Sequence, residues 1–293
     1  MTGRPVDASD VLRIAVEDTK ARQTRAVILA GGRGTRLAPF TSVLPKPLMP
    51  VGERAILELV VERLESCGIV DITFCVGYLS HLIRAVFDSR QDDEARISYV
   101  LEQRPMGTAG PLRLVEGLDD TFVVMNGDVL TDLDYGELLA YHRSQPNVVT
   151  IATYARSVKI DYGVLRFDGD GNGNGNGHVN GQRITGYVEK PEYTSAVSMG
   201  IYVFEPSALD YIAQDEPSDF PDLVQALLRA GQPVGAYRHD GMWFDIGRQD
   251  DYKEAVEAWL QAPSLQNGGP SRDNGTRTGT TRPRASVSRE AGC

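Results

Sequence analysis

The chain has 293 residues, 41% of them hydrophobic, and a formal net charge of −10. This length suits one large domain or two smaller ones, and the hydrophobic share is that of an ordinary globular protein. The acidic balance argues against a general nucleic-acid-binding surface, and no apolar run approaches the roughly 20 residues of a membrane span.

Cysteine and histidine usage gives no sign of a metal or disulfide framework. The three cysteines are an odd count without metal-type spacing, and the four histidines are scattered, so neither a disulfide framework nor a zinc site is expected. The first residues contain no apolar signal-peptide core, so we expect a cytoplasmic protein without a membrane partner.

From residue 25 the sequence alternates between strand-like and helix-like patterns. Strands are expected at residues 26–30, 72–76, 97–101, 121–125 and 148–154, and helices at 55–66, 79–87, 108–116 and 135–143. This alternation predicts an α/β fold, a Rossmann-like, mostly parallel sheet flanked by helices.

After about residue 155 the pattern changes to a smaller mixed subregion. Strands are expected at 163–167, 183–188, 198–204 and 234–238, and helices at 221–230 and 250–260. The predicted layout is a polar extension at 1–24, one domain at 25–260 with halves 25–154 and 155–260, and a disordered tail at 261–293. The repeat DGNGNGNG at 170–177 is typical of a flexible hairpin tip or linker, and no function is assigned to it.

The loop after the first strand concentrates glycine and positive charge. Gly31, Gly32 and Gly34 allow backbone N–H groups to approach an anion, and Arg36 and Lys46 add cations. Ligands of open α/β sheets sit beyond the carboxyl ends of the strands. These residues therefore predict a cradle for a triphosphate or pyrophosphate.

Three other interpretations of this loop are weaker. A dinucleotide fingerprint needs the last glycine of G-x-G-x-x-G and a helix after it, whereas here that glycine is missing and a proline-rich loop follows. A P-loop needs G-K-[ST], which is absent from this loop. A purely structural glycine turn is disfavoured by the added arginine and lysine.

Several motifs together resemble one family. They are GGRGTRL at 31–37, PKP at 45–47, NGD at 126–128, VEKP at 188–191, GIY at 200–202 and WFDIG at 243–247. In this order they resemble the sugar-1-phosphate nucleotidylyltransferases, over residues 25–260. The resemblance implies transfer of a nucleotidyl group from an NTP to a sugar 1-phosphate.

The resemblance also implies a catalytic set with Mg²⁺ as cofactor. Asp128 and Asp245 would hold the metal between the two substrates, although either aspartate alone could be a turn or strand-end residue. Arg36 would stabilise charge on the β and γ phosphates, and Lys46 would contact the region of the α-phosphate.

The nucleotide side of the implied site includes one residue that suggests the base. The implied nucleotide-binding residues are Leu29, Gly31, Gly32, Gly34, Thr35, Arg36, Glu102, Gly107 and Thr108. A carboxylate at Glu102 only accepts hydrogen bonds, which suits the N1–H and N2 amino group of guanine. The string E-x-x-P-M-G-T-A-G-P-L also resembles mannose-1-phosphate guanylyltransferases, so GTP is favoured. The alternative is the same chemistry with dTTP, UTP, CTP or ATP and glucose 1-phosphate. The adjacent Gln103 leaves the register of this assignment open.

The sugar-binding half carries the remaining implied residues. By resemblance, Gly163 and Ser198 would contact the sugar, Glu189 its hydroxyls and Lys190 its phosphate. The family often has asparagine where this chain has Ser198, which leaves the identity of the sugar, a hexose or a heptose, open.

Two other functions compete with the enzyme interpretation. A catalytically silent nucleotide-sugar-sensing subunit would have lost Arg36, Lys46, Asp128 or Asp245, yet all four are present. A nucleotide-dependent oxidoreductase is disfavoured by the broken fingerprint. Whether the chain forms a homo-oligomer stays open, since no hexapeptide repeat of the kind found in many family members is visible.

Overall fold

The computed structural model describes residues 24–90, 94–167 and 183–261. Most of the predicted N-terminal extension, the GN repeat and most of the predicted tail lie outside these ranges. None of the helices within them has the length and apolar content that crossing a bilayer requires.

A seven-stranded sheet in the order β12-β8-β11-β6-β1-β4-β5 forms the centre of the molecule. Its strands are β1 (Arg25–Ala30), β4 (Asp71–Val76), β5 (Arg96–Leu101), β6 (Phe122–Asn126), β8 (Val149–Lys159), β11 (Glu192–Phe204) and β12 (Val234–His239). β1 pairs in parallel with β4 and β6, β4 with β5, and β12 with β8, whereas β11 is antiparallel to β6 and β8. The mostly parallel α/β fold predicted from the sequence is confirmed.

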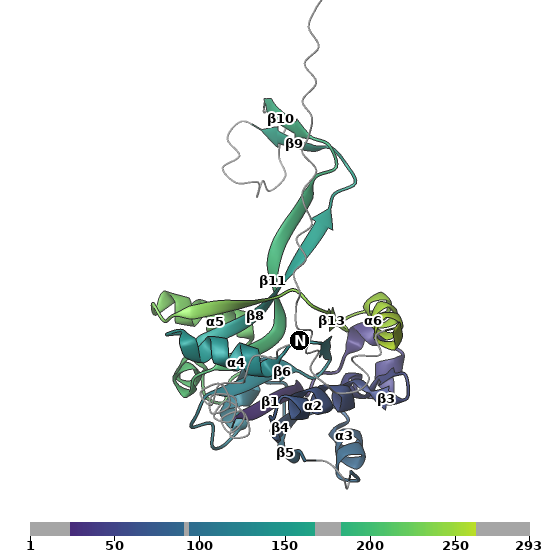
Figure 1. Ribbon diagram of the computed structural model, residues 1–293, viewed down its shortest axis with the longest axis vertical. Helices are drawn as coiled ribbons and strands as arrows, with labels where there is room; N and C mark the ends of the chain where they lie inside the picture. Colours follow the sequence, from purple (N-terminus) through teal and green to yellow (C-terminus); the bar gives the residue numbers. More distant parts are fainter. Residues whose placement is uncertain (1–23, 91–93, 168–182, 262–293) are drawn as a thin grey trace, which may run out of the picture.

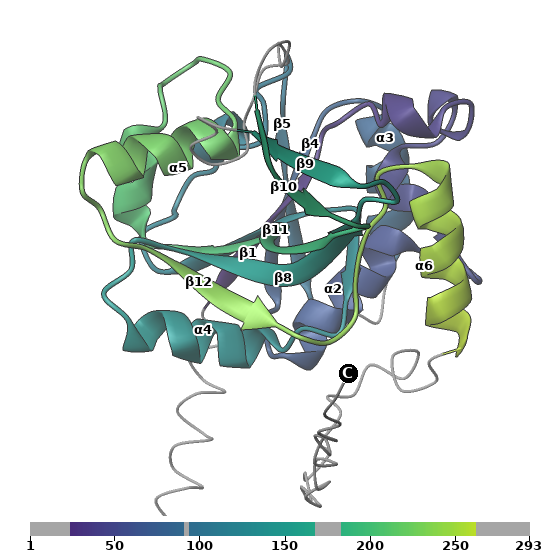
Figure 2. The same cartoon turned by 90° about the horizontal axis from the view of Figure 1, so that it is seen from above.

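Helices cover both faces of this sheet (Figures 1 and 2). One face packs against α2 (Ile56–Ser66), α3 (Ser80–Phe87) and α4 (Tyr135–Ser144), and the other against α5 (Phe220–Arg229). Helix α6 (Gln249–Gln261) joins the first core through Ala255 and Trp259 and contacts the short strand β13 (Trp243–Asp245). Alternate residues of β1 enter the two cores, with Ile28 on the first face and Val27 on the second. Burial on both faces explains why this strand is a continuous apolar run.

The strand order reverses beside β1. The chain proceeds from β1 to β4 and β5 on one side and then returns to β6 on the other. Such a switch point opens a crevice beyond the carboxyl ends of the strands, where α/β proteins bind ligands.

Two strands leave the sheet and form an arm (Figure 1). The arm consists of the outer ends of β8 and β11 together with the hairpin of β9 (Val164–Phe167) and β10 (Ile184–Val188). A bulge in β11 between Ser198 and Tyr202 marks the point where the arm begins, and Gly200 adopts φ 74° within it.

One expected helix and two small ladders differ from the sequence prediction. The helix expected at residues 108–116 is a short 3-10 helix at Gly110–Leu114, because the amides of Ala109 and Gly110 bond to the carbonyl of Ser218. The ladders β2–β3 (Pro50–Val51 with Arg54–Ala55) and β7–β13 (Val129–Thr131 with Trp243–Asp245) were not expected.

Candidate active site

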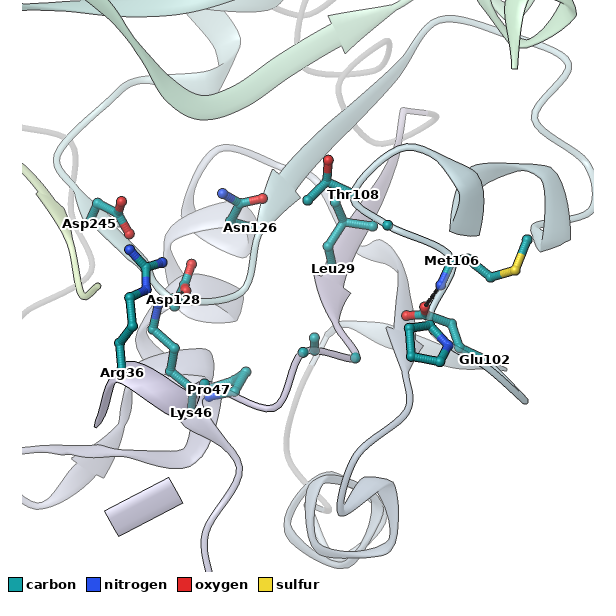
Figure 3. A pocket seen from close by; sticks show the side chains of 16 residues that line it. Leu29, Arg36, Lys46, Pro47, Glu102, Met106, Thr108, Asn126, Asp128 and Asp245 are labelled. Carbon is teal, nitrogen blue, oxygen red and sulfur yellow. Dashed lines mark hydrogen bonds and ion pairs between the residues drawn. The ribbon is translucent and has the colours of Figure 1, made fainter. Parts of the chain in front are cut away.

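A cavity of about 430 Å³ lies beyond the carboxyl ends of β1 and β6 (Figure 3). This volume is within the range of small-molecule sites. The cavity is lined by Leu29, Ala30, Gly31, Gly32, Gly34, Arg36, Lys46, Pro47, Glu102, Pro105, Met106, Gly107, Thr108, Asn126, Asp128 and Asp245. Cations and aspartates gather at one end and Glu102 lies at the other, with Leu29 between them.

The glycine turn holds Arg36 at the cavity. Gly34 has φ 59°, a conformation that suits glycine, and its carbonyl accepts a hydrogen bond of 2.8 Å from the Thr41 hydroxyl. A Cβ at Gly34 would lie 3.1 Å from the Cβ of Lys46, so the turn and the lysine pack closely. Leu37 is fully buried and anchors the short 3-10 helix that carries Arg36.

Lys46 and Asp128 form an ion pair within this cavity. The Lys46 side chain is 11% exposed and the Asp128 side chain 18%, so water screens the pair only weakly. The second carboxylate oxygen of Asp128, Oδ1, is buried and has no hydrogen-bond partner. A buried oxygen of this kind is costly unless a cation or donor satisfies it.

The β7–β13 ladder brings the second aspartate to the first. Asp128 immediately precedes β7, and Asp245 pairs with Val129. The amide of Ile246 donates to the Asp128 carbonyl at 3.3 Å, which continues the ladder beyond β13. Two residues that are 117 positions apart in the sequence therefore share one end of the cavity (Figure 3).

The charges around Asp245 favour a cation at this end. Loss of contact with water, and then the negative charge of Asp128, raise the pKa of Asp245, while Lys46 and Arg36 act in the opposite direction. A divalent cation between the two carboxylates would relieve this repulsion and satisfy Asp128 Oδ1. No group of three or more metal-ligating side chains occurs among the described residues. The pair fits Mg²⁺, which binds one or two carboxylates and takes phosphate and water oxygens for the rest.

Glu102 forms the opposite wall of the cavity and packs on Gly31. A Cβ at Gly31 would lie 2.0 Å from Glu102 Oε1, so only glycine leaves room for this carboxylate. Burial raises the pKa of Glu102, and the Met106 amide, which donates to Oε2 at 3.3 Å, lowers it. Oε2 thus has a backbone donor, whereas no donor to Oε1 is found among the residues that the structure describes.

The predicted nucleotide-binding residues beside Glu102 have structural roles as well. Gly107 has φ 78°, and a Cβ there would lie 2.4 Å from the Ser218 carbonyl. The Thr108 hydroxyl donates to Asp219 at 3.1 Å and accepts from the amide of Phe220 at 2.9 Å, which ties the loop to α5. Thr35 lies in the 3-10 helix with Arg36 but does not line the cavity.

The predicted sugar-phosphate residues lie outside the cavity. Glu189 and Lys190 are exposed on the arm, and Glu189 accepts a hydrogen bond of 2.6 Å from the Tyr187 hydroxyl. Gly163 packs against the Tyr187 side chain. The Ser198 hydroxyl donates to the Tyr202 hydroxyl at 3.1 Å within the β11 bulge.

A second cavity of about 380 Å³ shares Asp245 with the first. It lies between the base of the arm, the β13 segment and α6, and is lined by Tyr154, Arg156, Gly241, Met242, Trp243, Phe244, Asp245, Asp251 and Glu254. The rings of Tyr154 and Trp243 are 5.3 Å apart. The cavity thus combines an aromatic wall with one arginine and several carboxylates.

Sequence reasoning missed several residues that line these cavities. Asn126 lies at the end of β6, and a Cβ on Gly200 would lie 2.5 Å from its Nδ2. Its place beside Asp128 in the NGD motif was the available signal. Arg156 and Tyr154 gave no signal, because they look like ordinary strand residues.

The fold and the first cavity place the chain among α/β proteins with a ligand site at the switch point of the sheet. It belongs to the nucleotidyl transferase family, whose profile matches residues 25–262.

Named relatives support a sugar-1-phosphate branch of this family. A UTP–glucose-1-phosphate uridylyltransferase of Synechocystis sp. is 33% identical over 80% of this chain and 63% of the relative. A mannose-1-phosphate guanyltransferase of Aspergillus oryzae is 32% identical over 83% of this chain and 66% of the relative. The chain therefore spans slightly less than two thirds of the length of these two relatives.

Solved structures share the fold. A putative glucose-1-phosphate thymidylyltransferase from Bacillus anthracis matches with a TM-score of 0.63 and 24% identity, covering 80% of this chain and 94% of that chain. HddC from Yersinia pseudotuberculosis matches with a TM-score of 0.60 and 24% identity, covering 80% of this chain and 99% of that chain.

Proposed function

We propose that this protein transfers a nucleotidyl group from an NTP, preferably GTP, to a sugar 1-phosphate in the cytoplasm. A phosphate oxygen of the sugar 1-phosphate attacks the α-phosphorus. The bond from the α-phosphorus to the oxygen that bridges to the β-phosphate breaks, and pyrophosphate leaves with that oxygen. The products are an NDP-sugar and pyrophosphate.

The convergence of Asp128, Asp245, Lys46 and Arg36 at one end of the cavity carries this proposal. Phosphoryl-type transfer depends on positioning and on neutralising charge, and only weakly on covalent help from the protein. The two cations suit phosphate oxygens, and the two carboxylates with one unpartnered oxygen suit a divalent cation.

Each of these residues has a defined part in the reaction. Asp128 and Asp245 would hold Mg²⁺, which supplies charge neutralisation on the reacting phosphates when bound. Arg36 binds the β and γ phosphates and stabilises the departing pyrophosphate. Lys46, which pairs with Asp128, would contact the region of the α-phosphate.

Glu102 supports guanine as the base. It lies at the end of the cavity opposite the aspartates, where the base of a bound triphosphate would reach (Figure 3). Its Oε1 can accept from guanine N1–H or N2, while uracil or thymine would present carbonyl oxygens beside their single N–H. The relatives include both a uridylyltransferase and guanyltransferases, so the preference for GTP rests on Glu102.

The second cavity is our proposed place for the acceptor. Arg156 suits a phosphate, and the Tyr154 and Trp243 rings suit the apolar face of a sugar. Asp245, shared by both cavities, lies where the two substrates would meet. We also propose that Gly163, Glu189, Lys190 and Ser198 bind the sugar phosphate. For these residues to reach a sugar phosphate bound beside Asp245, the arm would have to approach Asp245.

A silent sensing subunit is the second candidate. It would bind the same nucleotide or nucleotide sugar without turnover. The mostly buried Lys46–Asp128 pair and the nearby Asp245 favour the enzyme, because binding alone does not require two carboxylates to be held beside the phosphates.

A substrate matrix tests the proposal. Each common NTP is combined with each of several hexose and heptose 1-phosphates in the presence of Mg²⁺, and pyrophosphate release is measured. We expect release with GTP to exceed release with dTTP, UTP, CTP and ATP. Binding of a nucleotide without pyrophosphate from any pair would favour the silent subunit and reject the enzyme.

A further inference from the structure

A hydrogen-bonded clasp lies at the end of the β7–β13 ladder remote from the two aspartates. We define the clasp as Asp132, His239, Gly241 and Met242. Asp132 Oδ1 lies 2.8 Å from His239 Nε2 and accepts the Met242 amide at 2.6 Å. The Met242 carbonyl accepts from the Thr131 hydroxyl at 2.7 Å and from the Asp132 amide at 3.3 Å.

The clasp joins the ends of three strands. His239 ends β12, Met242 precedes β13, and Asp132 follows β7. A Cβ at Gly241 would lie 2.3 Å from Asp132 Oδ1, so glycine permits the close approach. Arg63 of α2 donates to the Asp132 carbonyl at 2.6 Å and fixes the clasp to the body of the molecule.

The ladder that the clasp closes is too short to fix its own register firmly. β7 and β13 pair through three residues each. A slip of one residue in such a ladder turns every side chain to the other face, which would remove Asp245 from Asp128. The clasp opposes this slip because Asp132 binds the residue that immediately precedes β13.

We propose that Asp132 and His239 are positioning residues that fix Asp245 opposite Asp128 and so preform the metal-binding pair. This inference rests on the proposed function, since it concerns the same two carboxylates. Neither Asp132 nor His239 lines the cavity or contacts the acid pair. They act through the backbone of β13.

The molecule offers a matched control near the opposite end of the strands, at the start of β6. His142 Nε2 lies 3.0 Å from Glu205 Oε1, a pair of the same chemistry as the clasp. Glu205 follows the end of β11 that pairs with Phe122, at the start of β6, whereas the cavity lies beyond the end of β6. Loss of this pair should affect stability without affecting the aspartates.

The test measures Mn²⁺ binding to the full chain by electron paramagnetic resonance, with folding checked by circular dichroism. We expect Asp132→Ala to weaken Mn²⁺ binding about tenfold, as for other groups that orient metal ligands. Asp132→Asn keeps an acceptor oxygen and should bind nearly as the unaltered protein does. Glu205→Ala should leave Mn²⁺ affinity unchanged even if it lowers the melting temperature.

The outcomes separate the clasp from the proposed function. Equal Mn²⁺ affinity for folded Asp132→Ala and Glu205→Ala overturns the clasp. If Asp132→Ala does not fold, His239→Ala decides in the same way, because it removes the side chain that holds Asp132 Oδ1 beside the Met242 amide. If the unaltered protein and Asp128→Asn both fail to bind Mn²⁺, the metal pair of the proposed function fails, and the clasp falls with it.

Discussion

Asp128 combines an ion pair with an unsatisfied oxygen, so we expect the site to be sensitive to substitution there. One oxygen pairs with Lys46, and the other is buried without a partner. Asp128→Asn keeps the shape but removes the charge that a cation requires. We expect the rate of pyrophosphate release to fall at least about a hundredfold, the scale of losing one electrostatic group at a reacting centre.

The control for this substitution is Asp240→Asn. Asp240 is an exposed aspartate that pairs with Arg238, close in sequence to β13 but absent from both cavities. It should leave the rate unchanged. Circular dichroism should show both variants folded, and an Asp128→Asn enzyme with the unaltered rate would remove Asp128 from the reaction.

Glu102 is the residue that connects cavity shape to nucleotide choice. Glu102→Gln replaces one acceptor oxygen by an amide donor, so we expect the ratio of kcat/KM for GTP to that for UTP to fall. Gln103→Ala is the matched control, and it also tests whether Gln103 contacts the base in place of Glu102. A changed profile in Gln103→Ala but not in Glu102→Gln would transfer the role to Gln103.

The raised pKa of Glu102 gives the same role a pH signature. Burial favours the protonated acid, so the carboxylate that accepts from guanine is lost at a higher pH than for a free glutamate. As pH falls, KM for GTP should rise through this raised pKa, and Glu102→Gln should lack that rise. Identical pH profiles for both proteins would contradict the assignment.

At the scale of elements, the β11 bulge packs against a residue that lines the cavity, Asn126. Gly200 has φ 74°, and a Cβ would lie 2.5 Å from Asn126 Nδ2. Gly200→Ala should therefore lower the free energy of unfolding by more than the about 1–2 kcal/mol of left-handed strain. It should also reduce activity, because Asn126 lines the cavity.

Gly231→Ala is the control that separates left-handed backbone strain from the steric clash with Asn126. Gly231 has φ 69°, and a Cβ there would meet nothing within 4 Å. Urea unfolding measures the loss in free energy of unfolding for Gly200→Ala and for Gly231→Ala. The difference between the two losses is the cost of the contact with Asn126. Equal losses of stability, with activity intact in both, would show that Asn126 moves aside without consequence.

Elements with strong periodicity could be predicted from the sequence, and those fixed by distant contacts could not. The central strand β1 and helix α2 are continuous or periodic in hydrophobicity, and both were predicted within two residues. The 108–116 segment also looked periodic, yet its amides bond to Ser218, more than 100 residues away. The β7–β13 ladder has three pairs and no local signal, although its consequence, the meeting of Asp128 and Asp245, was expected from the family resemblance.

At the scale of the whole molecule, the body and the arm divide the predicted site. The predicted phosphate-binding residues meet in one cavity of the body, whereas Glu189 and Lys190 lie on the projecting arm (Figure 1). Motif order led us to predict both as site residues, but it gave no sign that they would lie beyond the β11 bulge, on the arm. An isolated two-stranded ribbon is only marginally stable, so we expect the arm to be less stable than the body of the molecule.

The two sides of the acceptor site can be tested separately. Arg156 lines the second cavity at the base of the arm, and Lys190 is exposed farther along it. If the acceptor phosphate binds between them, Arg156→Ala and Lys190→Ala should each raise KM for the sugar 1-phosphate about tenfold, the scale of one charge-assisted hydrogen bond. KM for the NTP should stay unchanged, because neither residue lines the first cavity.

Lys159→Ala provides the control for charge on the arm. Lys159 is an exposed lysine at the end of β8 that pairs with Asp161. It should leave both KM values unchanged. If Lys190→Ala behaves like Lys159→Ala while Arg156→Ala raises KM, the acceptor binds at the base of the arm alone. If only Lys190→Ala raises KM, the second cavity is not the acceptor site, and the arm must close onto Asp245 by another route.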